Sequence, residues 1–195
     1  MLAPYRARMA RALPLPDPPL ADREITLRAW SGDDLPELVA ALQDPDIPRW
    51  TFIPSPYREA DGRAFLSKQE RDRTAGAGLA LAIAPAGGGM PLLGAIGIEP
   101  LDRAAGRGEI GYWVARERRG RGIATRAVRM LSAWAFEGLG LTRLEILPFA
   151  GNTASERVAE RAGFTREREL RAHRLHPLSG EVRDMWLYAL SRDER

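Results

Sequence analysis

The sequence has 195 residues, a hydrophobic fraction of 45%, a charged fraction of 28% and a formal net charge of +3, which suit one globular domain with a sizeable core. It has no cysteine and two histidines, which excludes disulfides and a cysteine nucleophile and makes a metal site unexpected. No apolar run reaches the ~18–20 residues that span a bilayer, and the small spread of positive charge does not indicate nucleic acid, so we expect a cytoplasmic protein without membrane or nucleic-acid partners.

Residues 1–20 are rich in arginine, alanine and proline and are predicted to form an extended arm. They show neither the compact apolar stretch nor the cleavage site of a signal peptide. Residues 21–195 are predicted to form a single domain. Its first strand is predicted at residues 24–28, where polar and apolar side chains alternate.

A first helix is predicted after Asp33 or Asp34, either of which can cap it, with Pro36 in the first turn. Its buried face should consist of the apolar residues at helical spacing, Leu35, Leu38, Val39 and Leu42. The proline-rich residues 44–57 are predicted to be a loop. A second helix is predicted over residues 58–73, ended by Gly76 and Gly78.

Three strands are predicted next, at residues 79–84, 92–101 and 109–114, joined by short glycine-containing turns. Consecutive strands with short connections form an antiparallel meander. The last of them leads into the stretch on which the functional argument depends.

That stretch is a glycine-rich turn between the 109–114 strand and a helix predicted over residues 123–137. Its glycines let an anion approach the backbone, and the free N–H groups and dipole of the helix start favour negative charge. Neighbouring arginines add cationic donors. The turn is therefore a candidate phosphate site, and the alternative is a solvated basic turn; its residues are Arg119, Gly120, Arg121, Gly122, Ile123, Ala124 and Thr125.

Beyond the helix, a strand at residues 143–147 should pair parallel to the 109–114 strand, because a helical crossover joins them. Residues 153–156 are typical of a capping box that opens another helix, which Gly163 ends. Two final strands are predicted at residues 164–171 and 183–190. His173 and His176, in the polar stretch between them, are predicted to lie on the surface.

The glycine turn matches the pattern [QR]-x-x-G-x-[GA] through Arg119, Gly122 and Ala124. It resembles the acetyl-CoA pyrophosphate loop of the GCN5-related N-acetyltransferase (GNAT) superfamily. The order of predicted elements from about residue 25 to residue 190 is that of this superfamily. The flanking segments are similar to its RimJ/RimL-like branch, which acetylates protein N-termini and small amines; they are residues 25–28, 109–114, Asn152-x-x-Ser155 and Ala162-Gly163-Phe164.

The resemblance implies an α+β fold of three α/β layers, with a mixed, mostly antiparallel sheet between helices. It also implies that the parallel 109–114 and 143–147 strands splay apart and that the pantetheine arm of acetyl-CoA lies between them as an added strand. Backbone groups near Trp113 and Val114 would bind the arm, and the Val114 N–H would stabilise the oxyanion. One departure from the branch is Arg126, where an acidic residue is common.

Three side chains are candidates for the chemistry. Glu109 could act as the base that deprotonates the amine, directly or through water, or could be an ordinary strand residue facing solvent. Ser155 could assist the departing thiolate, or could be a serine of a helix first turn. Asn152 could cap the same helix or contact the pantetheine or the acceptor. No tyrosine lies just after Ser155, where the superfamily often places its acid.

The resemblance places acceptor recognition in the 44–57 loop and the 172–180 segment, with Arg49, Trp50 and Tyr57 as candidate substrate-binding residues. The sequence therefore predicts an N-acetyltransferase, a monomer or homodimer, that moves an acetyl group from acetyl-CoA directly to a primary amine without a metal. Two alternatives remain open: a non-catalytic acyl-CoA-binding regulatory module, and nucleic-acid binding through the arginine cluster.

Overall fold

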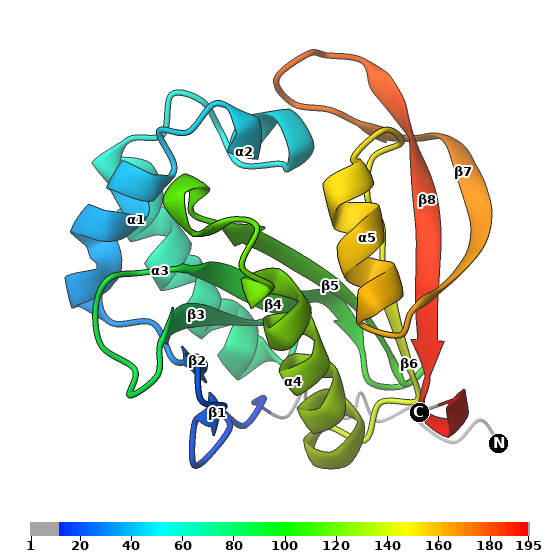
Figure 1. Cartoon of the computed structure of the whole chain (residues 1–195), viewed down its shortest axis with the longest axis horizontal. Helices are drawn as coiled ribbons and strands as arrows, with labels where there is room; N and C mark the ends of the chain where they lie inside the picture. Colours follow the sequence, from blue (N-terminus) through cyan, green and yellow to red (C-terminus); the bar gives the residue numbers. More distant parts are fainter. Residues whose placement is uncertain (1–11, 195) are drawn as a thin grey trace, which may run out of the picture.

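An eight-stranded sheet crosses the computed structural model, which describes residues 12–194, and helices cover both of its faces (Figure 1). The strands are β1 (Leu20–Ala21), β2 (Ile25–Arg28), β3 (Leu79–Pro85), β4 (Gly94–Asp102), β5 (Arg107–Val114), β6 (Arg143–Ile146), β7 (Thr165–Leu175) and β8 (Val182–Ser191). The helices are α1 (Leu35–Ala41), α2 (Asp46–Trp50), α3 (Glu59–Ala75), α4 (Ile123–Gly138) and α5 (Thr153–Arg161), with short 3-10 turns at Gly32–Asp34, Arg116–Arg118 and Arg192–Glu194.

The strand order is β1-β2-β3-β4-β5-β6-β8-β7. Every neighbouring pair is antiparallel except β5 and β6, which are parallel because α4 crosses between them. The predicted fold class, a mixed and mostly antiparallel sheet between helical layers with one parallel junction, is confirmed.

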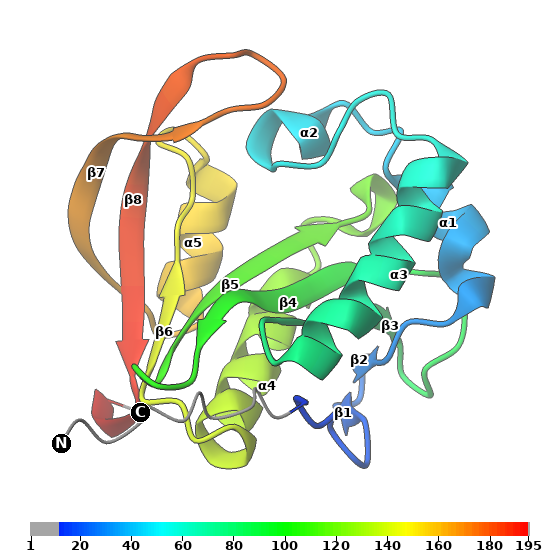
Figure 2. The ribbon, with the colours of Figure 1, turned by 180° about the vertical axis from the view of Figure 1, so that it is seen from behind.

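Two apolar clusters hold the layers together. Helix α4 lies on one face of the sheet (Figure 1). Its buried residues in the core cluster are Ile123, Ala127, Val128, Leu131, Ala135 and Phe136. On the other face, α1 and α3 cover the sheet (Figure 2), and the second cluster gathers Leu38, Leu42, Tyr57, Ala95 and Trp113 among others. Burying one such Leu or Phe side chain contributes about 1.5–3 kcal/mol to the stability of the fold. Packing on both faces therefore holds the central strands in place.

Helix α2 corrects the prediction of a loop over residues 44–57. Pro48 lies inside it, in the first turn, where the missing N–H has no helical partner in any case. The Asp44 side chain accepts a hydrogen bond from the Asp46 N–H at 3.2 Å and turns the chain into the helix. A proline-rich segment can therefore carry one short helix.

The start of the chain differs in part from the predicted arm. The prediction for residues 1–11 lies outside the described residues, whereas residues 12–20 pack on the domain. Leu13 is fully buried, and its N–H donates to the Arg73 carbonyl at 2.8 Å. Leu20 pairs with Leu27, so the arm ends as the edge strand β1.

The cap of the first helix is also corrected. Neither Asp33 nor Asp34 caps α1 with its side chain. Instead, Ser31 and Asp34 form a capping box around the preceding 3-10 turn. Asp34 is buried because Arg28 pairs with both of its oxygens, at 2.7 and 2.8 Å.

Candidate active site

The parallel strands β5 and β6 separate soon after they meet. Their register comprises Arg107 opposite Arg143, Gly108 opposite Leu144 and Glu109 opposite Glu145. Beyond Glu109, β5 continues for five residues to Val114, and α5 and its preceding loop border the opening. The result is a V-shaped gap whose narrow end is at Glu109.

Backbone groups of β5 face into this gap. The Ala115 N–H donates to the Leu93 carbonyl at 2.9 Å, which makes Ala115 and Leu93 a hydrogen-bonded pair. Pairs alternate along an antiparallel ladder, so Val114 opposite Gly94 is a non-hydrogen-bonded pair whose polar groups point away from β4. The same alternation turns the Tyr112 backbone toward the gap and the Trp113 backbone toward β4. The Val114 N–H is thus available to a ligand.

The glycine-rich turn forms the wide end of the gap. Gly120 and Gly122 both have φ of 76°, a conformation that side chains with a Cβ rarely adopt. Gly122 is the N-cap of α4, and within residues 12–194 no side chain caps this helix. The first-turn N–H groups of a sixteen-residue helix are therefore left open toward an anion.

Two arginines near this turn are held by carboxylates. The Arg119 guanidinium donates to Asp44 at 2.5 Å and to Asp46 at 3.3 Å, and its Nε donates to the Val114 carbonyl at 3.1 Å. It therefore joins the turn to the segment that begins α2. Arg126, which departs from the family pattern, pairs with Asp22 at 2.9 Å.

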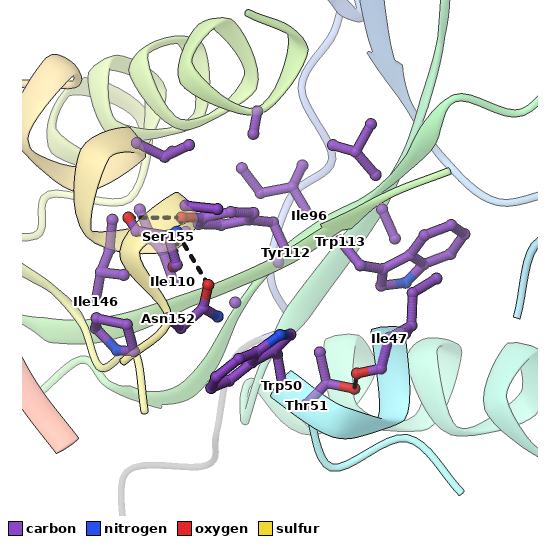
Figure 3. Close-up of a pocket in the computed structure, with 18 of the residues that line it drawn as sticks. Ile47, Trp50, Thr51, Ile96, Ile110, Tyr112, Trp113, Ile146, Asn152 and Ser155 are labelled. Atoms are coloured by element: carbon purple, nitrogen blue, oxygen red, sulfur yellow. Dashed lines mark hydrogen bonds between the residues drawn. The ribbon is translucent and has the colours of Figure 1, made fainter. Parts of the chain in front are cut away.

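A hydroxyl pair lies on the α5 side of the gap (Figure 3). The Tyr112 hydroxyl is 2.8 Å from Ser155 Oγ, and the Ser155 N–H donates to Asn152 Oδ1 at 3.2 Å. Asn152 is the N-cap of α5, one of the two roles predicted for it, so the cap lies one residue before the Thr153 of the predicted capping box. Burial raises the pKa of Tyr112 to about 12, so its hydroxyl keeps its proton at neutral pH.

Glu109 lies on the other side of β5. Side chains alternate along a strand, so Glu109 and Trp113 face α2 and α3 while Tyr112 faces α4 and α5. Both Glu109 oxygens accept hydrogen bonds from Arg174 of β7, at 2.9 and 2.5 Å. The sequence argument missed Arg174, because nothing local marks an arginine in a strand of many charges as a site residue.

The three predicted acceptor residues do not lie together in the structure. Trp50 lines the cleft from α2 (Figure 3), and Arg49 stacks on its ring at 5.0 Å. Tyr57 is buried against α3 and lines a second, smaller cavity. His176 corrects the surface prediction: it is 1% exposed, with its ring 5.2 Å from that of Phe149.

The gap opens into one cleft of about 1010 Å³, large enough for an extended cofactor and part of an acceptor. Its carboxylates are Asp46, Glu99 and Glu109, and its arginines are Arg118, Arg119, Arg157, Arg161 and Arg174. The excess of arginine suits a phosphorylated ligand. Among residues 12–194 no group of histidines and carboxylates could hold a metal ion, and no helix is long and apolar enough to cross a membrane.

Similarity to known proteins agrees with this geometry. A sequence model of the acetyltransferase (GNAT) domain matches residues 24–165. YdaF of Bacillus subtilis (strain 168), whose provisional name is ribosomal N-acetyltransferase, is 40% identical over 103 residues, or 53% of this chain and 55% of that protein. The chain thus spans about half the length of the curated relatives it matches.

Solved structures match over a greater length. A crystal structure described as a probable acetyltransferase superposes with a TM-score of 0.80 and 30% identity, covering 89% of this chain and 96% of the other. RimJ of Mycobacterium smegmatis, in complex with CoA-disulfide, superposes with a TM-score of 0.79 and 25% identity, covering 87% of this chain and 83% of that chain.

Proposed function

The chain belongs to the acetyltransferase (GNAT) domain family, and from that premise we propose that it transfers an acetyl group from acetyl-CoA to a primary amine. The acceptor is a protein N-terminus or a small amine, and the transfer is direct, within a ternary complex. The observation that carries the proposal is the gap between β5 and β6, which combines an open backbone N–H at Val114 with an anion site at Gly122.

Successive parts of the gap fit the pyrophosphate, the pantetheine arm and the thioester of acetyl-CoA. Its pyrophosphate fits the α4 N-terminus, where Gly120 and Gly122 leave room beside the backbone. The amides of its pantetheine arm fit the polar groups of Tyr112 and Val114 that point away from β4. This arrangement brings the thioester from the glycine-rich turn to the Val114 N–H, in the cleft that Glu109 and Ser155 also line. In this proposal Arg121, Ile123, Ala124 and Thr125 surround the phosphates, and Arg119 positions the turn through its ion pairs with Asp44 and Asp46.

The chemistry then proceeds by addition and elimination. The neutral amine attacks the thioester carbonyl, and the oxyanion that forms receives a hydrogen bond from the Val114 N–H. Collapse breaks the carbon–sulfur bond, and the thiolate leaves beside the Ser155 hydroxyl. Thiols have pKa values around 8.5, so the leaving group needs little assistance. Glu109, on the opposite side of β5, is the candidate acceptor of the proton that the amine loses.

The acceptor enters, in this proposal, between α2 and the β7–β8 hairpin. Trp50 supplies an aromatic wall there, and the Arg183 guanidinium donates to the Arg49 carbonyl at 3.2 Å, which links the two sides of the entrance. The proposed partners are acetyl-CoA and the amine, for a monomer or homodimer in the cytoplasm. Nucleic acid is not among them, because the arginines gather around a cleft of small-ligand size.

One observation favours a second candidate, a non-catalytic acyl-CoA-binding regulatory module. Both oxygens of the candidate base Glu109 are already engaged by Arg174. A module of this kind would bind acetyl-CoA without releasing CoA.

Release of CoA thiol in the presence of an amine panel separates the two candidates. The chain has no cysteine, so a thiol-specific dye reports CoA alone. We expect release that depends on the amine and falls in Ser155→Ala and Glu109→Gln, with mass spectrometry showing one added acetyl group on the amine. Acetyl-CoA binding by calorimetry without release from any amine would favour the module. Absence of acetyl-CoA binding would rule out both.

A further inference from the structure

An arginine–glutamate pair lies in the cleft beside the proposed base: Arg174 holds Glu109. Arg174 Nη1 is 2.9 Å from Glu109 Oε1, and Nη2 is 2.5 Å from Oε2, a two-point pairing of a planar guanidinium with a carboxylate. The two side chains are 29% and 17% exposed, so solvent screens them only in part. Both line the cleft, at the point where β5 leaves β6.

A bulge in β7, the strand that carries Arg174, orients this side chain. Leu170 pairs with Met185 and Arg174 pairs with Arg183, so three residues of β7 lie opposite the single Asp184 of β8. Within this bulge Ala172 has φ of 44°, and its N–H donates to the Asp184 carboxylate at 2.8 Å. Left-handed backbone at a residue with a Cβ costs roughly 1–2 kcal/mol. Bulges next to sites re-aim side chains, and this one places Arg174 over β5.

Arg174 also contacts the acceptor side of the cleft. Its guanidinium carbon is 5.6 Å from the centre of the Phe52 ring, just after α2. The Phe52 ring is in turn 5.4 Å from that of Phe149. One arginine thus joins the sheet, the C-terminal hairpin and the proposed acceptor wall.

The carboxylates that line the cleft are ion-paired, whereas some of its arginines are not, among the described residues. Each of its carboxylates has a cationic partner on the protein: Asp46 pairs with Arg119, Glu99 with Lys68, and Glu109 with Arg174. Arg118 and Arg157, by contrast, have no ion-pair partner among residues 12–194. Within the described part of the chain, the cleft therefore offers an acceptor no unpaired carboxylate for a second ammonium group.

We propose that Arg174 is a specificity-determining residue that excludes polycationic acceptors, an inference that rests on the proposed acetyl transfer. By pairing with Glu109 it occupies the carboxylate that an ammonium group could bind. Arg118 and Arg157 of the cleft, unpaired within the described residues, then oppose a second cation, since like charges brought together oppose binding. An amine with a pKa near 8 and no second cation, such as a peptide α-amine, is neutral in a larger fraction of molecules than a polyamine amine and meets less opposition. A polyamine, with amines of high pKa, meets repulsion and finds no counter-charge.

Removal of Arg174 should therefore change the acceptor preference. In Arg174→Met, Glu109 becomes an unpaired carboxylate at the acceptor end and can bind an ammonium group. The measurement is the ratio of kcat/KM for spermidine to that for a lysine-free peptide with a free N-terminal serine, by CoA thiol release in the full chain. We expect wild type to favour the peptide and the ratio to rise at least about tenfold in the variant, which corresponds to about 1.4 kcal/mol.

Arg174→Gln serves as a second uncharged variant if the methionine variant does not fold, and the same rise is expected. Arg174→Lys keeps the positive charge and should keep the wild-type ratio. The matched control is Arg171→Met in the same bulge, where an exposed arginine pairs only with Glu169 among the described residues; it should leave the ratio unchanged.

An unchanged ratio in the folded uncharged variants would overturn this inference alone. So would a wild type that acetylates spermidine as well as the peptide. Failure of wild type to release CoA with either amine would instead overturn the proposed function, and this inference with it.

Discussion

The Tyr112 hydroxyl lies 2.8 Å from Ser155 Oγ and so joins β5 to the first turn of α5 across the proposed cofactor gap. The two residues are 43 positions apart in the chain. Because burial raises the pKa of Tyr112 to about 12, this pair is a chain of two protonated hydroxyls on the side where the thiolate would leave. Tyr112 thereby places a phenol beside Ser155, which no tyrosine follows closely in the sequence.

Tyr112→Phe and Ser155→Ala should each lower kcat about tenfold, below the ~10²–10⁴ typical of general acid catalysis because the thiolate is a good leaving group. The double variant should be no slower than the slower single variant, since the two hydroxyls act as a unit. Steady-state thiol release measures the three rates. Multiplicative losses, or losses matched by lower melting temperatures, would contradict a joint role.

Arg119→Ala should disturb the acceptor side more than cofactor binding, because Asp44 and Asp46 hold this guanidinium. Hydrogen exchange in residues 44–52 should accelerate. Arg118→Ala is the matched comparison: Arg118 lines the cleft without an ion pair among the described residues, so its loss should raise the Kd for acetyl-CoA about tenfold. Equal loss of acetyl-CoA affinity in both variants, with unchanged exchange at 44–52, would show that Arg119 binds phosphate instead.

Gly122→Ala should weaken acetyl-CoA binding and lower the free energy of unfolding by about 1–2 kcal/mol, the cost of a Cβ in left-handed backbone. Gly122 has φ of 76°, and nothing lies within 4 Å of where its Cβ would be. The loss of stability therefore comes from backbone strain, and the loss of affinity comes from the Cβ meeting the bound phosphate. Gly140→Ala controls for strain, because Gly140 has φ of 69° with equally open surroundings beyond α4. Urea unfolding should report similar losses, and calorimetry should report weaker binding only for Gly122→Ala.

Alkaline pH should destabilise the folded chain. Burial raises the pKa of Tyr57, Tyr112 and Tyr188 from 10.0 to about 12. Between these values the unfolded chain has lost phenol protons that the folded chain retains, so stability is full below about pH 10 and declines as pH rises toward 12. Urea unfolding at a series of pH values, alongside phenolate absorbance, tests this. A free energy of unfolding that stays constant between pH 10 and 12 would contradict the raised pKa values of these tyrosines.

Local patterns in the sequence predicted the elements that build the cofactor side. A strand-like run marked β5, helical spacing marked α4, and the glycines between them marked the turn, because each pattern is determined by neighbouring residues. Helix α2 escaped prediction because its stability depends on burying Ile47 and Pro48 against the domain, while its proline content indicated a loop.

The acceptor side depends on contacts that no local pattern encodes. Arg174 reaches Glu109 across 65 positions, and only because a bulge at Ala172 turns β7. His176 is buried although polar residues surround it in the sequence, because its ring packs on Phe149. Such placements follow from the assembled sheet, and the residue types alone give no reason to expect them.

Three residue pairs hold β5 to β6, and through them the five-stranded part of the sheet to the three-stranded part. Bound acetyl-CoA would cross-link the two parts, so its concentration should govern how often they come apart. At a hundred times its Kd, a ligand of this kind stabilises the native state by about 2.7 kcal/mol. The lifetime of this protein against heat and proteases should therefore depend on the metabolic supply of its proposed substrate.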